Sequence, residues 1–208
     1  MHTREVIVMA QPIEEIRPQE SLIGLLKIFP RQGEWTEADY FHLPETNKII
    51  ELSEGRLIIS PSPTTQHQQI VNRLNFLLYS HVLNNSLGEV VTSPMDVRLW
   101  KGNIRQPDII FMSNKNRKRI TRRYFGVPDL VMEILSKGTA KVDKEDKFQE
   151  YEKAGVLEYW IVDPFKKGIN VYTLENGIYV LFGKWGIGEI AKSKLLGGFE
   201  VSIDKVMG

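Results

Sequence analysis

The run Val127-Pro-Asp-Leu-Val-Met-Glu-Ile-Leu-Ser136 contains the strand around which we expect the rest of the chain to fold. Alternation along a strand gives it two faces, one carrying Leu130, Met132 and Ile134, and the other carrying Val131, Glu133 and Leu135. Both faces are apolar apart from Glu133, so the strand is predicted to lie inside a sheet that is covered on both sides. A buried carboxylate is unfavourable unless it is paired or coordinates a cation. Glu133 is therefore the first candidate for a functional residue.

The length and composition indicate one globular domain. At 208 residues the chain can form one well-buried domain with little left for a second. Its 42% hydrophobic and 25% charged residues are ordinary for a folded protein. Residues 1–34 mix charges, prolines and short apolar pieces. We therefore expect an N-terminal arm there and a single domain over residues 35–208.

Simple counts exclude several classes of protein. A net charge of +1 means that affinity for nucleic acid has to come from a local cluster of basic residues. The absence of cysteine excludes disulfides, thiol catalysis and cysteine-based zinc sites. The four histidines are too scattered to suggest a histidine-based metal site. No apolar run approaches the ~20 residues of a membrane span and no signal pattern opens the chain, so we expect a soluble, cytoplasmic protein.

Periodicity and turn signals predict the other helices and strands. In chain order these are a short helix after Thr36, a hairpin over 49–60, a helix over 65–86, strands near 90–91, 95–100 and 106–112, the strand quoted first, a helix over 141–154, a strand over 158–162, a hairpin over 169–182 and a strand pair around 197–198. This order indicates a mixed α/β architecture with a central sheet and β-hairpins at both ends.

Two acids on successive predicted strands suggest a metal site. Asp108 lies near the start of the strand before that of Glu133, and the two carboxylates can meet at one end of the sheet if these strands are neighbours. With the backbone carbonyl of Ile134 they offer oxygen ligands, which suit Mg²⁺ and, as a substitute, Mn²⁺. Such an ion can activate a water and neutralise charge on a phosphoryl group. Each acid also has an ordinary interpretation: Asp108 as a strand-start cap, and Glu133 as the partner of a buried Arg or Lys.

A lysine on the next predicted helix can complete such a site. Asp143, Lys147 and Tyr151 recur at four-residue spacing and therefore share one helix face. The Lys147 ammonium is a candidate for stabilising negative charge during the reaction. The ordinary alternative is a surface pair between Asp143 and Lys147 on a solvated helix. Glu51 and Glu54 lie in a predicted turn, and we leave them outside the site.

A basic run separates the two strands that carry the acids. It contains six basic residues in nine, namely Lys115, Arg117, Lys118, Arg119, Arg122 and Arg123. This density favours contact with phosphates, although a solvated loop would have the same composition. His67 opens the long helix, where a capping or surface role competes with a substrate contact. The pair Tyr159-Trp160 is interpreted as core or interface and not as a surface for base stacking.

Several separated motifs together resemble a known family. They are Pro107-Asp108, the run Pro128–Ser136, Asp143 with Lys147 and Tyr151, and the run Gly155–Pro164. In this order they resemble the Uma2 family, which belongs to the restriction-endonuclease-like, or PD-(D/E)XK, superfamily. The resemblance runs from about Trp35 to the C-terminus and includes Glu51–Gly55 and the region around Pro61 and His67. It implies a restriction-endonuclease-like α/β fold, with a mixed central sheet flanked by helices and with added β-hairpins.

The resemblance also implies a function. It indicates a Mg²⁺-dependent endonuclease that hydrolyses DNA phosphodiester bonds, with Asp108 and Glu133 as metal ligands and catalytic residues. The simplest superfamily pattern has a lysine two residues after the second acid, where this chain has Leu135, and the resemblance moves that role to Lys147. A homodimer is expected by analogy with enzymes that cut both strands. Two other functions stay open: a DNA-binding or interaction module without turnover, and a metal-dependent hydrolase acting on RNA or a nucleotide.

Overall fold

The computed structural model describes residues 29–208 except 45, 47 and 137–144. The chain divides into two units, Met1–Arg31 and Gln32–Gly208, and the elements below lie in the second unit. The predicted arm over residues 1–34 falls almost entirely outside the described residues, and so does Asp143.

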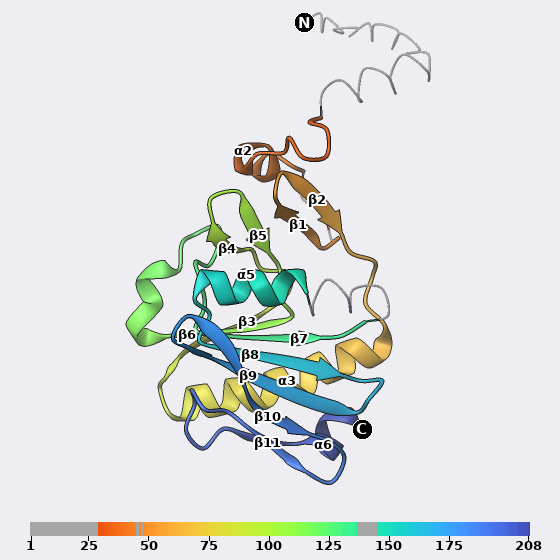
Figure 1. Cartoon of the computed structure of the whole chain (residues 1–208), viewed down its shortest axis with the longest axis vertical. Coiled ribbons are helices and arrows are strands. Elements are labelled where there is room, and N and C mark those ends of the chain that lie inside the picture. Colours follow the sequence, from red (N-terminus) through yellow and green to blue (C-terminus); the bar gives the residue numbers. More distant parts are fainter. Residues whose placement is uncertain (1–28, 45, 47, 137–144) are drawn as a thin grey trace, which may run out of the picture. The chain divides into compact units, whose positions relative to one another are not determined.

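The second unit contains the predicted strands and helices, together with a short strand at 103–105, a 3₁₀ helix at 114–119 and a C-terminal helix at 203–207 that the sequence did not predict. The elements are α2 (Glu37–Phe41), β1 (Ile50–Ser53), β2 (Arg56–Ile59), α3 (Thr65–Asn84), β3 (Gly88–Thr92), β4 (Val97–Trp100), β5 (Asn103–Arg105), β6 (Ile109–Ser113), the 3₁₀ helix η1 (Asn114–Arg119), β7 (Leu130–Ile134), α5 (Asp146–Ala154), β8 (Glu158–Asp163), β9 (Gly168–Glu175), β10 (Ile178–Trp185), β11 (Ile190–Lys192), β12 (Glu200–Ser202) and α6 (Ile203–Met207). Figure 1 labels most of them.

The strand quoted first, β7, lies inside a six-stranded mixed sheet. The strand order is β10-β9-β8-β7-β6-β3, and β7 pairs parallel with β8 and antiparallel with β6. Every residue of β7 is buried. Its two predicted faces are confirmed, because one hydrophobic core contains Leu130, Met132 and Ile134 and a second contains Val131 and Leu135.

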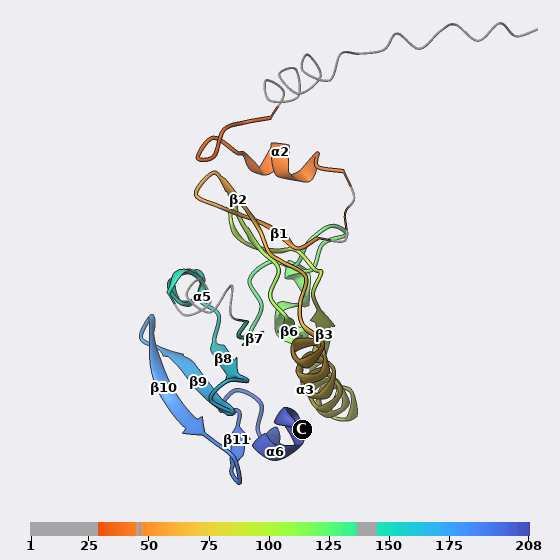
Figure 2. The same cartoon turned by 90° about the vertical axis from the view of Figure 1, so that its right-hand side faces the viewer.

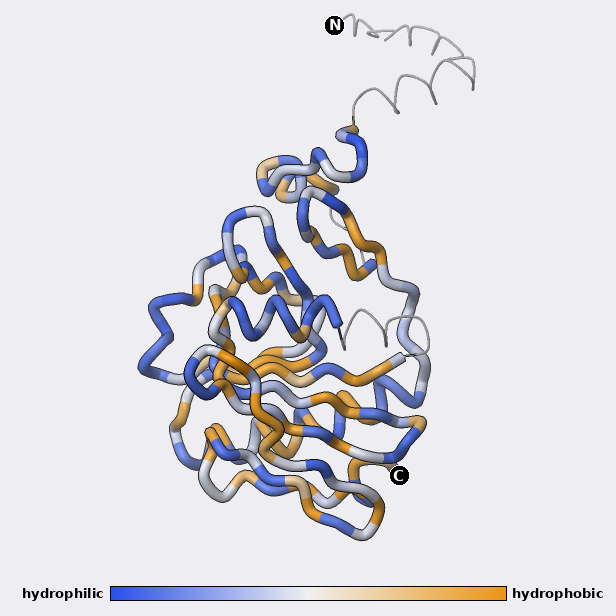
Figure 3. Tube along the Cα trace, in the orientation of Figure 1, coloured by the Kyte–Doolittle hydropathy of each residue, from blue (hydrophilic) through white to orange (hydrophobic). Residues whose placement is uncertain are grey.

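Helices α3 and α5 cover opposite faces of this sheet (Figure 2). The apolar stripe of α3, including Ile70, Leu74 and Leu78, packs in the first core together with α6 and β12. On the other face, Tyr151 of α5 and Val156 just after it pack in the second core. Figure 3 shows the strands largely hydrophobic, while α5 and the segment after β6 are largely hydrophilic. The tyrosine and tryptophan interpreted as core, Tyr159 and Trp160, are fully buried.

The hairpins form as predicted, but the first one belongs to a second sheet. β1 pairs with β2 around Glu54 and Gly55, whose φ angles are +48° and +70°, as a tight hairpin turn requires. β1 also pairs with β5, which produces a four-stranded sheet in the order β2-β1-β5-β4. The sequence signals did not reveal this pairing, because the hydrophobic pattern of a strand does not identify a partner fifty residues away. The hairpin β9–β10 and the final strand pair β11–β12 are confirmed.

Strand direction defines two ends of the six-stranded sheet. We call one the exit end, where β3, β7, β8 and β10 finish and β6 and β9 begin. The opposite one is the far end, where β6 finishes and β7 begins. This assignment follows from the parallel pairing of β7 with β8 and the antiparallel pairing of the other neighbours. The candidate site lies at the exit end.

Candidate active site

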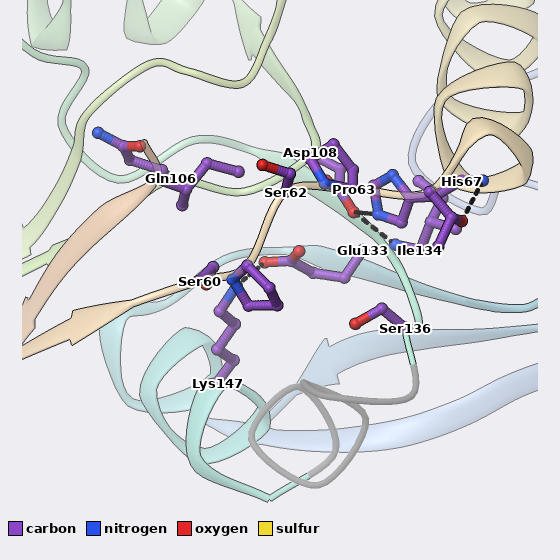
Figure 4. A pocket seen from close by; sticks show the side chains of 13 residues that line it. Ser60, Ser62, Pro63, His67, Gln106, Asp108, Glu133, Ile134, Ser136 and Lys147 are labelled. Carbon is purple, nitrogen blue, oxygen red and sulfur yellow. Dashed lines mark hydrogen bonds and ion pairs between the residues drawn. The ribbon is translucent and has the colours of Figure 1, made fainter. Parts of the chain in front are cut away.

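Asp108 and Glu133 line the same pocket at the exit end (Figure 4). Asp108 immediately precedes β6, and Glu133 is the fourth residue of β7. The strands pair with Ile109 opposite Met132, so extending the register by one step brings Asp108 opposite Glu133. Directly opposed residues share a face of the sheet with Cβ atoms roughly 5 Å apart. The predicted meeting of the two acid-bearing strands is confirmed.

Asp108 is tied to two other elements by one carboxylate oxygen. Its Oδ2 accepts a hydrogen bond of 2.7 Å from the backbone N–H of Ile134 and lies 3.2 Å from Nε2 of His67. The residue is buried, and these contacts to β7 and α3 differ from those of a local strand-start cap. His67 is buried, and its side chain lines the pocket. The cap residue of α3 is Thr64, whose Oγ1 accepts from the His67 N–H at 3.2 Å. The capping or surface interpretation of His67 is therefore wrong, and the substrate contact stays a prediction.

Glu133 is held by two donors from α5. Its Oε1 accepts hydrogen bonds from Lys147 Nζ at 2.9 Å and from the Tyr151 hydroxyl at 2.7 Å. Burial and then the charge of Glu133 raise the pKa of Tyr151 well above its ordinary value, so the hydroxyl stays protonated and donates. The Lys147 side chain is only 8% exposed, which excludes the solvated surface position. The ordinary interpretation of Glu133 as the partner of a buried lysine therefore holds geometrically, and its partner is the candidate catalytic lysine.

Glu51, which the turn signals of the sequence placed outside the site, is a buried member of it. The residue lies in β1, not in the turn, and is 1% exposed. Its Oε1 lies 3.2 Å from Lys147 Nζ and accepts a hydrogen bond of 2.9 Å from the Gln106 N–H. Its Oε2 accepts a hydrogen bond of 3.1 Å from Arg105. Burial favours a higher pKa for Glu51, but the Lys147 ammonium and the Arg105 guanidinium outweigh it and hold the pKa below its ordinary value. The signal was available: an acid among Ile49, Ile50 and Leu52 repeats the misfit of Glu133.

Arg105 extends these contacts away from the pocket. Its guanidinium, 1% exposed, binds Glu150 of α5 through Nε at 2.5 Å and through a second nitrogen at 2.9 Å. The Ser53 hydroxyl donates to the same carboxylate at 2.6 Å. We call Glu51, Arg105, Glu133, Lys147 and Glu150 the buried network. Buried charges are tolerated when they are paired and hydrogen-bonded, as they are here. The buried network links β1, β5, β7 and α5 around the pocket.

The remaining pocket wall comes mainly from the segment between β2 and α3. Residues 60–64 line it, together with Gln106 and Ser136. The prolines at 61 and 63 fix the backbone of this segment and end β2. The pocket has a volume of about 180 Å³, enough for a few water molecules and a small oxyanion group.

The donor chemistry of the pocket fits a hard divalent cation. Two carboxylates and the neighbouring backbone of Ile134 supply oxygen atoms, and within the described ranges no cluster of three or more His, Cys, Asp or Glu side chains is suited to hold a metal. A cation with few protein ligands and several waters is the usual state of Mg²⁺. The contacts of Asp108 with described residues all use Oδ2, so Oδ1 is left for a ligand.

The basic run is divided by the structure and is not gathered at the pocket. Lys115, Arg117, Lys118 and Arg119 belong to η1, which starts where β6 finishes, at the far end. Asn114 is six residue steps from Asp108, about 20 Å along a strand. Arg122 is exposed, whereas Arg123 lies over the Phe41 ring at 4.2 Å and donates to the Phe41 carbonyl.

Two further buried acids have structural surroundings. Glu158, fully buried, accepts from Trp160 Nε1, Ser193 Oγ and the N–H groups of Lys194 and Leu195. Asp129 accepts from the Ser113 N–H and from Asn116, and so anchors the start of η1. Neither acid lines the pocket. Burial of an acid is therefore not sufficient to identify the site, and the sequence alone gives both acids the same appearance as Glu133.

Comparison with known proteins relates the chain to a family model and to solved structures. The model of the Uma2 family, described as "Putative restriction endonuclease", matches residues 37–204. A crystal structure of "a putative nuclease belonging to DUF820" from Anabaena variabilis is similar in fold, with a TM-score of 0.72 and 20% sequence identity. The similarity covers 83% of this chain and 97% of that one. No curated protein matches the chain significantly.

Proposed function

The chain belongs to the Uma2 family, and from that premise we propose that it is a Mg²⁺-dependent endonuclease that hydrolyses DNA phosphodiester bonds, with Mn²⁺ able to substitute. The observation that carries the proposal is the pocket itself: Asp108 and Glu133 line it together, and the Lys147 ammonium is 2.9 Å from Glu133. Two carboxylates that can hold a cation beside one lysine ammonium suit hydrolysis of a phosphodiester, because negative charge on the phosphoryl oxygens must be neutralised.

Asp108, Glu133 and the carbonyl of Ile134 would hold the cation. When bound, the cation supplies Lewis-acid chemistry: it lowers the pKa of a water and neutralises charge on the phosphoryl oxygens. The hydrogen bond from the Ile134 N–H and the ion-pair contact with His67, both to Oδ2, fix the orientation of the Asp108 carboxylate. Those from Lys147 and Tyr151 fix that of Glu133. Such outer contacts orient metal ligands in many proteins.

Lys147 would act on the substrate. In hydrolysis a water oxygen forms a bond to phosphorus while the bond from phosphorus to one ester oxygen breaks, and the negative charge on the phosphoryl oxygens grows in the transition state. A fixed ammonium at the pocket wall stabilises that charge without reorganising. The position two residues after Glu133 belongs to Leu135, which is buried in the core, and α5 brings an ammonium to the same carboxylate instead.

Plasmid cleavage tests the proposal. Wild-type protein should nick or linearise DNA with Mg²⁺ and leave it intact with chelator, and Glu133→Gln should be inactive. Glu158→Gln is the matched control, because it changes a buried glutamate outside the pocket and should retain cleavage. Absence of metal-dependent cleavage by folded wild type, or equal activity in Glu133→Gln, would contradict the proposal.

One observation favours a second candidate function. Glu133, Lys147 and Tyr151 already satisfy one another, as they would in a DNA-binding or interaction module of this fold without turnover. Such a module would bind DNA, and neither Mg²⁺ nor Glu133→Gln would alter that binding by more than a small factor. The plasmid experiment separates the two candidates.

The proposal extends to assembly and location. Two identical sites related by a two-fold axis can cut both strands of a duplex, so we include a cytoplasmic homodimer. Light scattering at micromolar concentration would test the dimer. No helix in the described part of the chain is long and apolar enough to cross a membrane.

A further inference from the structure

The exit end of the sheet carries a second group of basic side chains, outside the pocket. Lys166 and Lys167 lie in the turn between β8 and β9, and Lys184 is next to the last residue of β10. All three are exposed. The directions of these strands place them at the same end of the sheet as Asp108 and Glu133.

The strand register connects Lys184 to Glu133 directly. Glu133 pairs with Ile161, Ile161 with Asn170, and Asn170 with Lys184. Directly paired residues share a face of the sheet, so these four residues form a row across one face. Three strand spacings of about 4.8 Å place the backbone of Lys184 about 14 Å from that of Glu133. At a rise of about 3.4 Å per nucleotide, the row spans a few nucleotides of a bound strand.

Lys166 and Lys184 line one shallow cleft of about 260 Å³ together with Ile161 and Asn170. The acids of the cleft are used by nearby turns: Asp163 accepts from the N–H groups of Phe165 and Lys166, and Glu189 accepts from that of Gly186. Among the residues that the structure describes, the ion pairs observed involve neither lysine. Both lysines are therefore exposed charges that line a cleft at the same end of the sheet as the pocket.

The basic residues of η1 do not share this relationship. They lie at the far end of β6 and β7, and Arg117 pairs with Glu89 at 2.7 Å. Both groups of basic residues carry positive charge, but only the lysines at the exit end lie beside the row that contains Glu133. A duplex bound with a scissile phosphate at the pocket passes over the exit end.

We propose that Lys166 and Lys184 contact the backbone phosphates of DNA on one side of the scissile bond, and that these two lysines, more than η1, anchor the substrate. The inference rests on the proposed function, because it takes the pocket as the place of the scissile phosphate. It identifies a binding surface that the amino-acid sequence alone does not indicate.

Salt dependence of DNA binding tests this surface. Fluorescence anisotropy with a labelled duplex in chelator, where the duplex stays intact, gives the slope of log affinity against log salt. The double variant Lys166→Gln/Lys184→Gln should bind more weakly, with a slope reduced by about 0.9 for each phosphate that is no longer neutralised. Lys115→Gln/Lys118→Gln removes the same two charges from η1 and should leave the slope near that of wild type. All four positions are exposed, so both variants should fold, which thermal unfolding would verify.

The outcomes separate the two proposals. The proposed binding surface is wrong if Lys166→Gln/Lys184→Gln has the same salt slope as wild type, or if the η1 variant loses more affinity. In either case, metal-dependent cleavage by wild type would still support the nuclease function. Wild type that neither binds nor cleaves DNA overturns both. A loss of affinity in Lys166→Gln/Lys184→Gln but not in the η1 variant supports the proposed binding surface, whether or not the protein cleaves DNA.

Discussion

Nζ of Lys147 lies 2.9 Å from Oε1 of Glu133, across the face of the sheet that α5 covers. The lysine is also 3.2 Å from Glu51 of the second sheet. One ammonium therefore joins β7, α5 and β1, and the pocket depends on all three. This geometry changes what substitutions here should do, because they act on a buried ionic network and not on a solvated helix surface.

Lys147→Met should abolish most cleavage and also destabilise the fold. Removal of a preorganised donor typically lowers the rate of the chemical step by about two to three orders of magnitude. Two buried carboxylates lose their lysine contact, although Glu133 keeps the Tyr151 hydroxyl and Glu51 keeps Arg105. The cost should therefore lie below the about 3–5 kcal/mol of a buried charge left with no partner. Lys147→Arg should restore little activity, because a planar guanidinium does not fit the place of a compact ammonium.

Single-turnover cleavage with saturating metal and DNA, below the unfolding temperature of every variant, measures the loss of cleavage rate in the Lys147 variants. Urea unfolding measures their loss of stability. Glu158→Gln provides a comparison, since it perturbs buried hydrogen bonds to a glutamate that lies outside the pocket. Wild-type rates in a folded Lys147→Met variant would remove the lysine from the mechanism.

Glu51→Gln should slow cleavage through Lys147. The variant loses the second carboxylate that contacts the ammonium, 3.2 Å from Nζ, and small displacements of catalytic groups can cost up to about 100-fold in rate. In a double-mutant cycle, Glu51→Gln should add little to the loss of rate already produced by Lys147→Met. Additive losses in rate would show that Glu51 acts independently of the lysine, through Arg105 and general stability.

Asp108→Asn/Glu133→Gln should abolish stabilisation by Mg²⁺. A ligand that binds only the native state raises its stability by about 2.7 kcal/mol at a hundredfold excess over Kd. Thermal unfolding with increasing Mg²⁺ should therefore shift for wild type and not for the double variant. Asp129→Asn serves as the control, because this buried aspartate anchors η1 at the far end. Equal shifts in wild type and the double variant would place the metal elsewhere.

The sequence was sufficient to predict the central strand and to predict that Asp108 and Glu133 meet at one end of the sheet, while their role as metal ligands stays a prediction. The two-sided apolar pattern of residues 130–135 specifies a buried strand, and only one misfit, Glu133, interrupts it. The sequence was insufficient where partners are distant in the chain. Whether Glu51 lies in an exposed turn or in a buried strand depends on its pairing with β5, which local pattern does not determine. For the same reason the basic run could not be placed, because its distance from the pocket depends on the direction of β6.

The pH dependence of stability should reveal the ionised state of Glu51. Its pKa is lowered below the ordinary 4.5, since Lys147 and Arg105 outweigh the effect of burial. A carboxylate with a lower pKa in the folded chain binds fewer protons there than in the unfolded chain, so stability rises with pH. The contribution is fully present above the unfolded pKa of about 4.3 and is lost as pH falls through the folded value. The difference in unfolding free energy between wild type and Glu51→Gln should therefore be constant near neutral pH and shrink on acidification.

Urea unfolding at a series of pH values measures this difference. Glu175→Gln is the exposed control, because Lys194 lowers the pKa of Glu175 at the surface. A difference that does not change with pH would mean that the Glu51 carboxyl is not stabilised as an anion in the fold.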